Sequence, residues 1–192
     1  MVANSGVIVF GTTDCKVIRW NYEEDVSEEI ELSRRPEDAV HQLFLDPTGS
    51  HLFICLKNGD NFYLHKRTPR PKKLARLQGI IVESIAFDRQ QTTEANTKSF
   101  LVGTDNGAIY EVALDSTGKE KHCNLVYQLE EHIPVSAMHF EITSGATEAD
   151  TRLFVLLATS RPTRLYHFLG GPSFQAMFQE YKDSGTTSFQ EV

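Results

Sequence analysis

The stretch Phe100-Leu-Val-Gly-Thr-Asp-Asn-Gly-Ala-Ile-Tyr-Glu-Val112 contains two short apolar runs separated by a tight polar turn. Asn106-Gly107 marks the turn, because a type I′ hairpin needs positive φ at both central residues and Asn-Gly tolerates this best. The apolar residues on both sides are mostly β-branched or aromatic, as is typical of strands. The stretch therefore predicts an antiparallel β-hairpin.

Three other stretches follow the same plan, at Ile8–Trp20, Leu52–Leu64 and Leu153–Phe168. The second of them carries the same turn signal, Asn58-Gly59. A further apolar segment precedes the last three hairpins, at Val40–Leu45, Val82–Phe87 and Val135–Phe140. The chain is therefore predicted to repeat one antiparallel unit.

The spacing of the unit indicates the fold. The first strands of the hairpins end near Gly11, Leu56, Gly103 and Ala158, in steps of 45, 47 and 55 residues. A period of about 40–50 residues with four strands per unit is typical of β-propellers. The last step is longer because a polar segment lies at Thr143–Asp150. A β-sandwich or another antiparallel fold is the alternative.

We predict an all-β fold, an incomplete WD40-like β-propeller of about three to three and a half four-stranded antiparallel blades. It occupies residues 1–170, with blades at roughly 1–32, 33–78, 79–130 and 131–170. A closed ring needs at least about four blades, so sheet faces are expected to stay uncovered. We therefore expect a segment or short product of a longer protein, with low stability alone.

The segment 171–192 breaks the β pattern. Phe174, Met177, Phe178 and Tyr181 follow the i, i+3, i+4, i+7 spacing of one helical face, and Ser173 is a suitable N-cap. We predict a short amphipathic helix, followed by a tail that leads to the next, missing blade. The apolar face would pack against a blade or be offered to a partner, and the spacing does not decide between these.

The composition limits the function classes. Acidic residues number 26 against 19 basic ones, for a net charge of −7, which argues against nucleic-acid binding. The three widely spaced cysteines, Cys15, Cys55 and Cys123, predict free thiols in a reducing, cytosolic compartment. The seven histidines form no metal-binding motif, and no nucleophile elbow or phosphate-binding loop occurs. We predict no catalytic, cofactor or metal site, and no enzymatic activity.

One local charge cluster stands out, the segment Lys66-Arg-Thr-Pro-Arg-Pro-Lys-Lys73, which Arg76 follows closely. Its two prolines disfavour sheet pairing. The segment is either a solvated loop between blades or an electrostatic contact for anionic lipid or an acidic protein surface. The candidate interaction residues are Lys66, Arg67, Arg70, Lys72, Lys73 and Arg76.

The ordered set of segments resembles a known family. It consists of Phe44–Phe53, Leu77–Ile85, Leu101–Glu111, Arg164–Phe168 and the helical pattern from Phe174 to Tyr181. Together these resemble the N-terminal propeller of the deep orange family, the homologues of vacuolar protein sorting-associated protein 18. In that family an α-solenoid and a RING domain follow the propeller, and no RING-type Cys/His spacing occurs in these 192 residues.

The resemblance implies a non-catalytic scaffold in a subunit of the HOPS and CORVET tethering complexes, which act in vesicle docking and fusion between endosome and lysosome or vacuole. The implied partners are other tethering subunits, with Rab GTPases and SNAREs through the assembled complex. The implied location is cytoplasmic, peripheral on the cytosolic face of late endosome and lysosome membranes. The alternative is a peripheral membrane or phosphoinositide-binding propeller that uses the basic loop 66–73.

Overall fold

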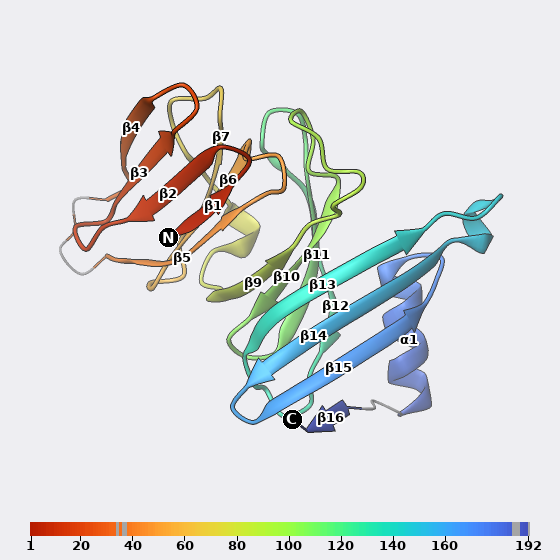
Figure 1. Ribbon diagram of the computed structural model, residues 1–192. Helices are drawn as coiled ribbons and strands as arrows, with labels where there is room; N and C mark the ends of the chain where they lie inside the picture. The colour runs from red at the N-terminus through yellow and green to blue at the C-terminus, as the bar shows by residue number, and fades with distance from the viewer. Residues whose placement is uncertain (34, 36–37, 186–188, 192) are drawn as a thin grey trace. The chain divides into compact units, whose positions relative to one another are not determined.

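The computed structural model describes residues 1–33, 35, 38–185 and 189–191 (Figure 1). These residues form four four-stranded sheets, in which the strands follow one another in chain order. The chain divides into two compact units. Unit 1 holds Met1–Val82, Gln91–Lys98 and Leu114–Lys121, and unit 2 holds Glu83–Gln90, Ser99–Ala113 and His122–Val192.

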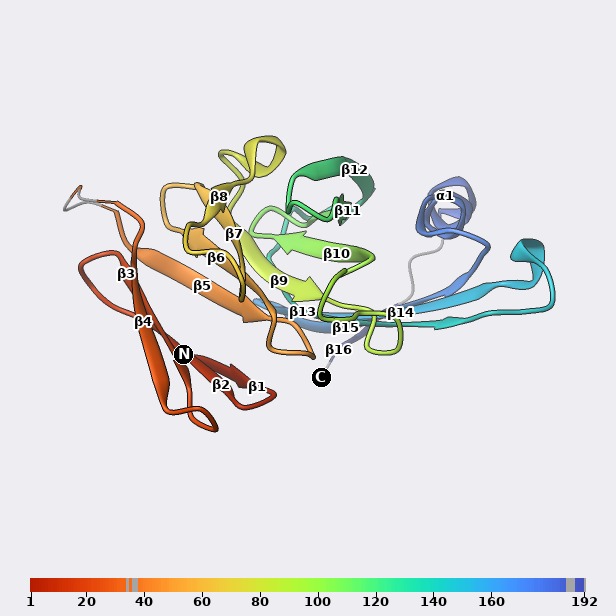
Figure 2. The ribbon, with the colours of Figure 1, turned by 90° about the horizontal axis from the view of Figure 1, so that it is seen from above.

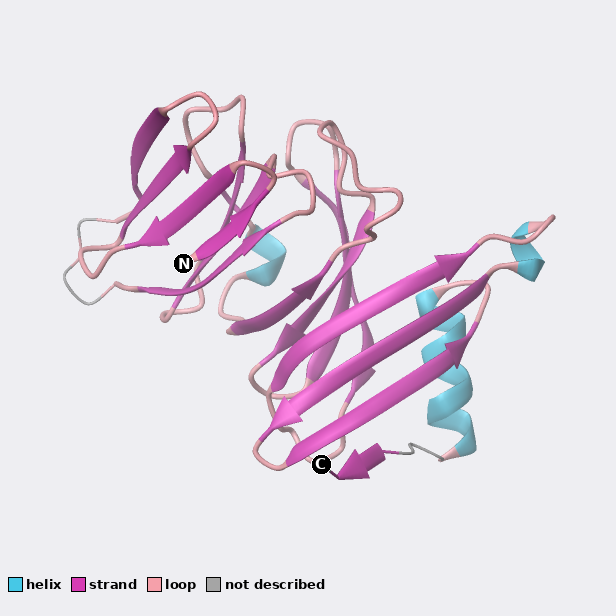
Figure 3. Ribbon diagram, in the orientation of Figure 1, coloured by secondary structure: helices cyan, strands magenta, loops and turns pink. Residues whose placement is uncertain are grey.

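The strands and helices have the following bounds (Figure 3). The first sheet contains β1 (Val2–Asn4), β2 (Val7–Gly11), β3 (Lys16–Asn21) and β4 (Val26–Glu31). The second contains β5 (Val40–Leu45), β6 (His51–Leu56), β7 (Asn61–His65) and β8 (Lys72–Lys73). The third contains β9 (Val82–Ala86), β10 (Ser99–Thr104), β11 (Ala108–Leu114) and β12 (Glu120–Gln128). The fourth contains β13 (Val135–Thr143), β14 (Arg152–Ser160), β15 (Thr163–Gly170) and β16 (Phe189–Glu191). The helices are α1 (Phe174–Ser184) and the 3-10 turns Ala75–Leu77 and Glu148–Asp150.

The predicted all-β, propeller-type fold is confirmed, with two differences in detail. The leading stretch forms a complete sheet rather than half of one, because β1 pairs with β2 and β4 pairs with β3. The segment 171–192 was predicted as a helix and a tail without a strand, whereas Phe189–Glu191 form β16. Its backbone pairs with β15, Tyr166 opposite Phe189, and completes the fourth sheet. Residues 186–188 and 192 of the predicted tail lie outside the described part.

The two Asn-Gly hairpins are present, but their turn type differs from the predicted type I′. Gly59 and Gly107 have a φ of +82°, whereas neither Asn58 nor Asn106 has a positive φ. Each turn begins with a hydrogen bond from the glycine amide to the carbonyl three residues earlier, at 3.1 Å in Gly59 and 3.4 Å in Gly107. This geometry is a type I turn followed by a left-handed glycine, which the longer loops between these strands accommodate.

Each unit has its own apolar core. In unit 1 the first and second sheets bury Val9, Val17 and Ile30 together with Leu52, Ile54 and Leu64. In unit 2 the third and fourth sheets bury Leu101, Ile109, Val135, Val155, Leu157 and Phe168, among others. Strands that are apolar on both faces, such as β6 with six buried residues in a row, need cover on both sides.

Helix α1 packs on the core of unit 2, beside the fourth sheet (Figure 2). The Ser173 hydroxyl accepts the Ala176 amide at 3.2 Å, as predicted for the N-cap, and Gly185 ends the helix with a φ of +62°. Phe174, Met177 and Phe178 are buried, so the apolar face belongs to the core. The structure thus decides between the two interpretations of this helix, since its apolar face is already covered.

In each unit, one strand glycine lies against the first valine of the following sheet, and we call this contact the glycine socket. A Cβ on Gly11 would lie 2.9 Å from Val40 Cγ1, and a Cβ on Gly103 would lie 2.7 Å from Val135 Cγ1. Both valines begin the first strand of the following sheet, and the strand register shifts at a bulge directly after each. The positions Gly11 and Gly103, which give the sequence its period, therefore let the bulged strand approach closely.

Candidate functional site: the basic segment 66–76

The basic segment leaves β7 and continues through β8 into the 3-10 turn at Ala75–Leu77. The Lys66 ammonium lies 2.7 Å from the Glu94 carboxylate, and the Arg67 guanidinium lies 3.7 Å from the same group. The hydrogen bond from Lys66, more than any other cause, lowers the pKa of Glu94. The first two cations of the segment therefore share an anionic partner from the loop at 91–98.

The later cations contact the turn at 115–119 and the start of β12. The Lys72 ammonium donates a hydrogen bond to the Thr117 carbonyl. The Arg76 amide donates to both oxygens of the Glu120 carboxylate, at 3.0 and 3.2 Å, and its guanidinium donates to the Lys121 carbonyl at 3.1 Å.

The turn at 115–119 is itself fixed by local hydrogen bonds. The Asp115 carboxylate accepts the Thr117 hydroxyl at 2.7 Å and the Lys119 amide at 3.0 Å. These bonds, that of Thr117 first, lower the pKa of Asp115 to about 2. The Thr117 carbonyl that Lys72 contacts is therefore held in a tight turn.

Two candidate residues remain. The Lys73 ammonium lies 2.8 Å from the Asp60 carboxylate within the second sheet. Arg70 is exposed, and among the described residues the structure records no ion pair or hydrogen bond for its side chain.

Five of the six predicted interaction residues therefore contact groups of unit 1. Exposed contacts of this kind each contribute little to stability, but together they fasten the neighbouring loops to the second sheet. This arrangement favours the interpretation as a loop between blades. Recruitment of anionic lipid or protein through these side chains stays a prediction.

A buried polar cluster, which the sequence analysis did not single out, lies beside the basic segment. His51 Nε2 donates to the Thr93 carbonyl at 2.8 Å, and His51 Nδ1 accepts the Tyr63 hydroxyl at 2.7 Å. His51 is 1% exposed and Tyr63 is 6% exposed. The only available signal was a histidine at the start of an otherwise apolar strand, which does not reveal its partners.

Burial controls the ionisation of this cluster. It lowers the pKa of His51 and raises the pKa of Tyr63 to about 12. Asp46 is fully buried, and its carboxylate accepts the amides of Ser50 and His51 at 2.8 and 2.7 Å. The cluster therefore holds a neutral histidine, which fastens the loop at 91–98 to the second sheet.

We predict that the stability of this cluster falls in mild acid. Because the folded pKa of His51 lies below its ordinary value of 6.5, the unfolded chain binds more protons as the pH drops through 6.5. The free energy of unfolding should decrease there and level off below the folded pKa. His51→Gln should flatten this slope in urea unfolding at a series of pH values, while His132→Gln, at an exposed position, should not. Equal slopes in the native chain and His51→Gln would contradict the prediction.

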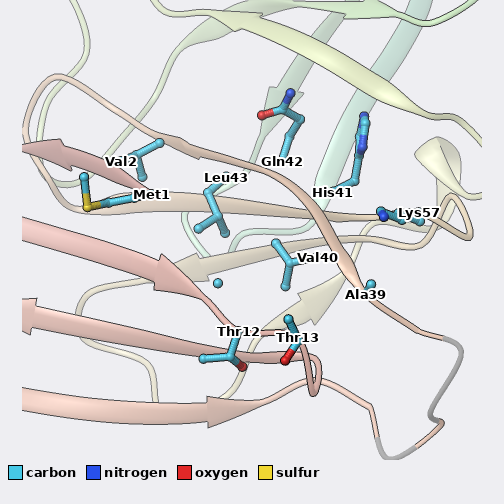
Figure 4. A pocket seen from close by; sticks show the side chains of 11 residues that line it. Met1, Val2, Thr12, Thr13, Ala39, Val40, His41, Gln42, Leu43 and Lys57 are labelled. Atoms are coloured by element: carbon cyan, nitrogen blue, oxygen red, sulfur yellow. The ribbon is translucent and has the colours of Figure 1, made fainter.

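A cavity of about 310 Å³ lies where the turn after β2 meets β5 (Figure 4). Val40 points to the side of Thr12 and Thr13, whereas His41 and Gln42 extend to the opposite side of the strand. Because of the bulge between Val40 and Gln42, the consecutive side chains of His41 and Gln42 lie on the same side of the strand. The volume is at the lower end of the range for small-molecule sites.

The described residues were also compared with the predictions for cysteines, metal sites and membrane-spanning helices. Cys15, Cys55 and Cys123 are not joined in disulfides. Within the described ranges, no three His, Cys, Asp or Glu side chains gather in a way that could hold a metal ion. No helix in this part of the chain has the length and apolar character needed to cross a bilayer.

Four repeated antiparallel sheets define the chain as a β-propeller segment. The β-propeller domain of Cps50 (Swd1) from Myceliophteria thermophila has a similar fold, with a TM-score of 0.52 at 12% identity. That likeness covers 86% of this chain and 49% of the solved chain.

The family is shown by the sequence as a whole. Residues 1–192 match the model of the Pep3/Vps18/deep orange β-propeller domain, so the chain belongs to this family. It is 34% identical to the vacuolar sorting protein 18 of Arabidopsis thaliana over 95% of its length, and 34% identical to the vacuolar protein sorting-associated protein 18 homolog of Danio rerio over 87%. The chain spans only 19% and 18% of these relatives.

Proposed function

We propose that this chain acts as a non-catalytic scaffold and interaction segment in vacuolar protein sorting. Its membership of the Pep3/Vps18/deep orange family along the whole chain carries this proposal. The relatives in Arabidopsis thaliana and Danio rerio are named for vacuolar sorting, and the aligned region covers nearly all of this chain. A propeller segment supplies surfaces and loops for binding, and a few aromatic or arginine anchors would provide most of the affinity.

The finer form of the proposal is a role in a HOPS or CORVET tethering subunit, in docking and fusion between endosome and lysosome or vacuole. Its partners would be other tethering subunits, with Rab GTPases and SNAREs reached through the assembled complex. Its place would be the cytosolic face of late endosome and lysosome membranes. The resemblance of the ordered sheet and helix segments to the deep orange family supports this form.

A segment exchange tests the proposal. In Danio rerio cells that lack their own homolog, the relative is supplied with its aligned 182-residue segment replaced by this chain. The exchanged protein should restore delivery of a lysosomal cargo and should co-precipitate the other tethering subunits. The relative with the segment deleted should do neither. A stably expressed exchange protein that fails in both assays would contradict the proposal, whereas rescue without co-precipitation would contradict only the tethering form.

The alternative, binding to phosphoinositide or another anionic lipid through the basic segment, has its own test. Lys72 and Lys73 already contact Thr117 and Asp60, so we expect the chain to float weakly with phosphoinositide-containing liposomes. If lipid binding is real, Lys72→Glu with Lys73→Glu abolishes it, and added salt weakens it. Arg70→Glu measures the effect of the cation of this segment for which the described residues record no contact. Flotation that none of these changes affects would rule out the basic segment as the lipid site.

A further inference from the structure

Thr68 lies inside the basic segment and is followed directly by Pro69. The chain has seven prolines, and Pro69 is the only one that follows a serine or a threonine. Proline-directed protein kinases modify a serine or threonine that precedes a proline, and they bind the substrate as an extended peptide. A proline disfavours the helical conformation of the residue before it and so favours an extended one. The sequence around Thr68 therefore fits the active site of such an enzyme.

The backbone around Thr68 is held by weak contacts. β7 ends at His65 and β8 begins at Lys72, so the half-buried Thr68 lies in the connection between two strands. Its amide and its hydroxyl both donate to the His65 carbonyl, at 2.9 and 3.0 Å. Pro69 and Pro71 have no amide hydrogen to donate. Because each neutral hydrogen bond contributes only about 1 kcal/mol, local opening can present the Thr68 hydroxyl to an enzyme.

The charges around Thr68 suit a phosphate group. Arg70 follows two residues later, and the described part of the chain records no ion pair or hydrogen bond for its side chain. Lys66 and Arg67 share one carboxylate, that of Glu94, at 2.7 and 3.7 Å. Among the described residues, these three cations therefore have one recorded anionic partner. A phosphorylated threonine would supply a charge of about −1.5 to −2 and three acceptor oxygens.

We propose that Thr68 is a phosphorylation site of a proline-directed protein kinase. In the reaction the Thr68 oxygen attacks the γ-phosphorus of ATP, and the bond from that phosphorus to the bridging oxygen breaks. ADP leaves, and the hydroxyl proton passes to a base of the kinase. The new phosphate pairs with the Arg70 guanidinium, which can donate two parallel hydrogen bonds to it. It also competes with Glu94 for Lys66 and Arg67.

The modification acts as a switch in the contacts of the basic segment. The phosphate carries more charge than the Glu94 carboxylate and is nearer in sequence to Lys66, so the lysine binds it instead. Glu94 then loses the hydrogen bond that lowers its pKa, and this pKa rises toward its ordinary value. The loop at 91–98 stays attached, because the His51 ring still donates to the Thr93 carbonyl at 2.8 Å. Phosphorylation therefore changes the partner of the basic segment without releasing the loop.

A kinase assay read by mass spectrometry tests the site. The purified chain is incubated with ATP, magnesium ions and a cyclin-dependent or a mitogen-activated kinase. We expect one phosphate, on Thr68, whereas Thr68→Val should accept none and Pro69→Ala should react at least about 10-fold more slowly. A synthetic peptide of residues 62–74 is the positive control, because it has no fold that could withhold the hydroxyl. A folded chain that stays unmodified, with or without modification of the peptide, or a Pro69→Ala variant that reacts at the native rate would overturn the proposal.

Phosphorus NMR of the modified chain tests the contacts of the phosphate. A phosphothreonine releases its second proton near neutral pH, and nearby cations favour that release. Arg70→Gln should therefore move the midpoint of the phosphate titration to higher pH, by about half a pH unit. Lys57→Gln removes an exposed cation in the turn before β7, at the end of this strand opposite to the basic segment, and should leave the midpoint unchanged. Equal midpoints in the native chain and in Arg70→Gln would overturn the pairing of the phosphate with Arg70.

Discussion

Replacing Gly103 by valine is expected to destabilise unit 2 by about 3 kcal/mol, the upper part of the usual range for overpacking a core. A Cβ at this position would lie 2.5 Å from Ser84 Oγ and 2.7 Å from Val135 Cγ1. Neither neighbour has room to retreat, because Val135 is 0% exposed and the Ser84 hydroxyl donates to the Val135 carbonyl at 2.6 Å. Relief of the clash would break that buried hydrogen bond, which adds about 1 kcal/mol.

Urea unfolding followed by far-UV circular dichroism measures this loss. Gly103→Ala adds a single methyl group and tests the same clash if the valine variant does not fold. Ala137→Val is the matched control, since it adds two methyl groups at an exposed strand position of the same unit. A Gly103→Val variant as stable as Ala137→Val would show that the bulged strand can move away. It would contradict the claim that a glycine is required at this position.

Replacing Phe178 by alanine is expected to cost about 4 kcal/mol, as for other fully buried phenylalanines. Phe178 is 0% exposed, and its ring lies 5.1 Å from Tyr127 and 5.0 Å from Phe168, measured between ring centres. Its removal leaves a cavity between helix α1 and the two sheets of unit 2, and it removes the aromatic contacts as well. Helix α1 should then lose its main attachment.

The neighbouring substitution Gln179→Ala provides the control. Gln179 is exposed on the same helix, and its side chain makes one hydrogen bond, to Asp183 at 2.7 Å. The expected loss is therefore below about 1 kcal/mol, the usual value for an exposed position. The urea midpoint of each variant and its near-ultraviolet tyrosine signal report the difference. Similar midpoints for Phe178→Ala and Gln179→Ala would show that the helix contributes little to the core.

The propeller-type fold could be predicted because its signals are local. The glycines at 59 and 107 mark the hairpins, and the helical spacing from Phe174 to Phe178 marks α1. The turn type could not be predicted, since Asn-Gly is compatible with more than one turn and the length of the loop decides between them. The pairing of β16 was also missed, because a three-residue strand carries too short a pattern to show where it pairs.

The candidate site was predictable only as a run of charges. The sequence shows Lys72 and Arg76 as cations, but their partners Thr117 and Glu120 lie 45 and 44 residues further along the chain. The buried cluster of His51 was invisible for the same reason, since the Thr93 carbonyl that it contacts lies 42 residues away.

The sequence by itself therefore determined the repeating hairpins and the helix, because alternation, turn residues and helical spacing act between near neighbours. Only the tertiary structure decided which charges are engaged and which histidine is buried. Those properties depend on groups that folding brings together from distant parts of the chain. A local sequence pattern does not show which of these groups come into contact.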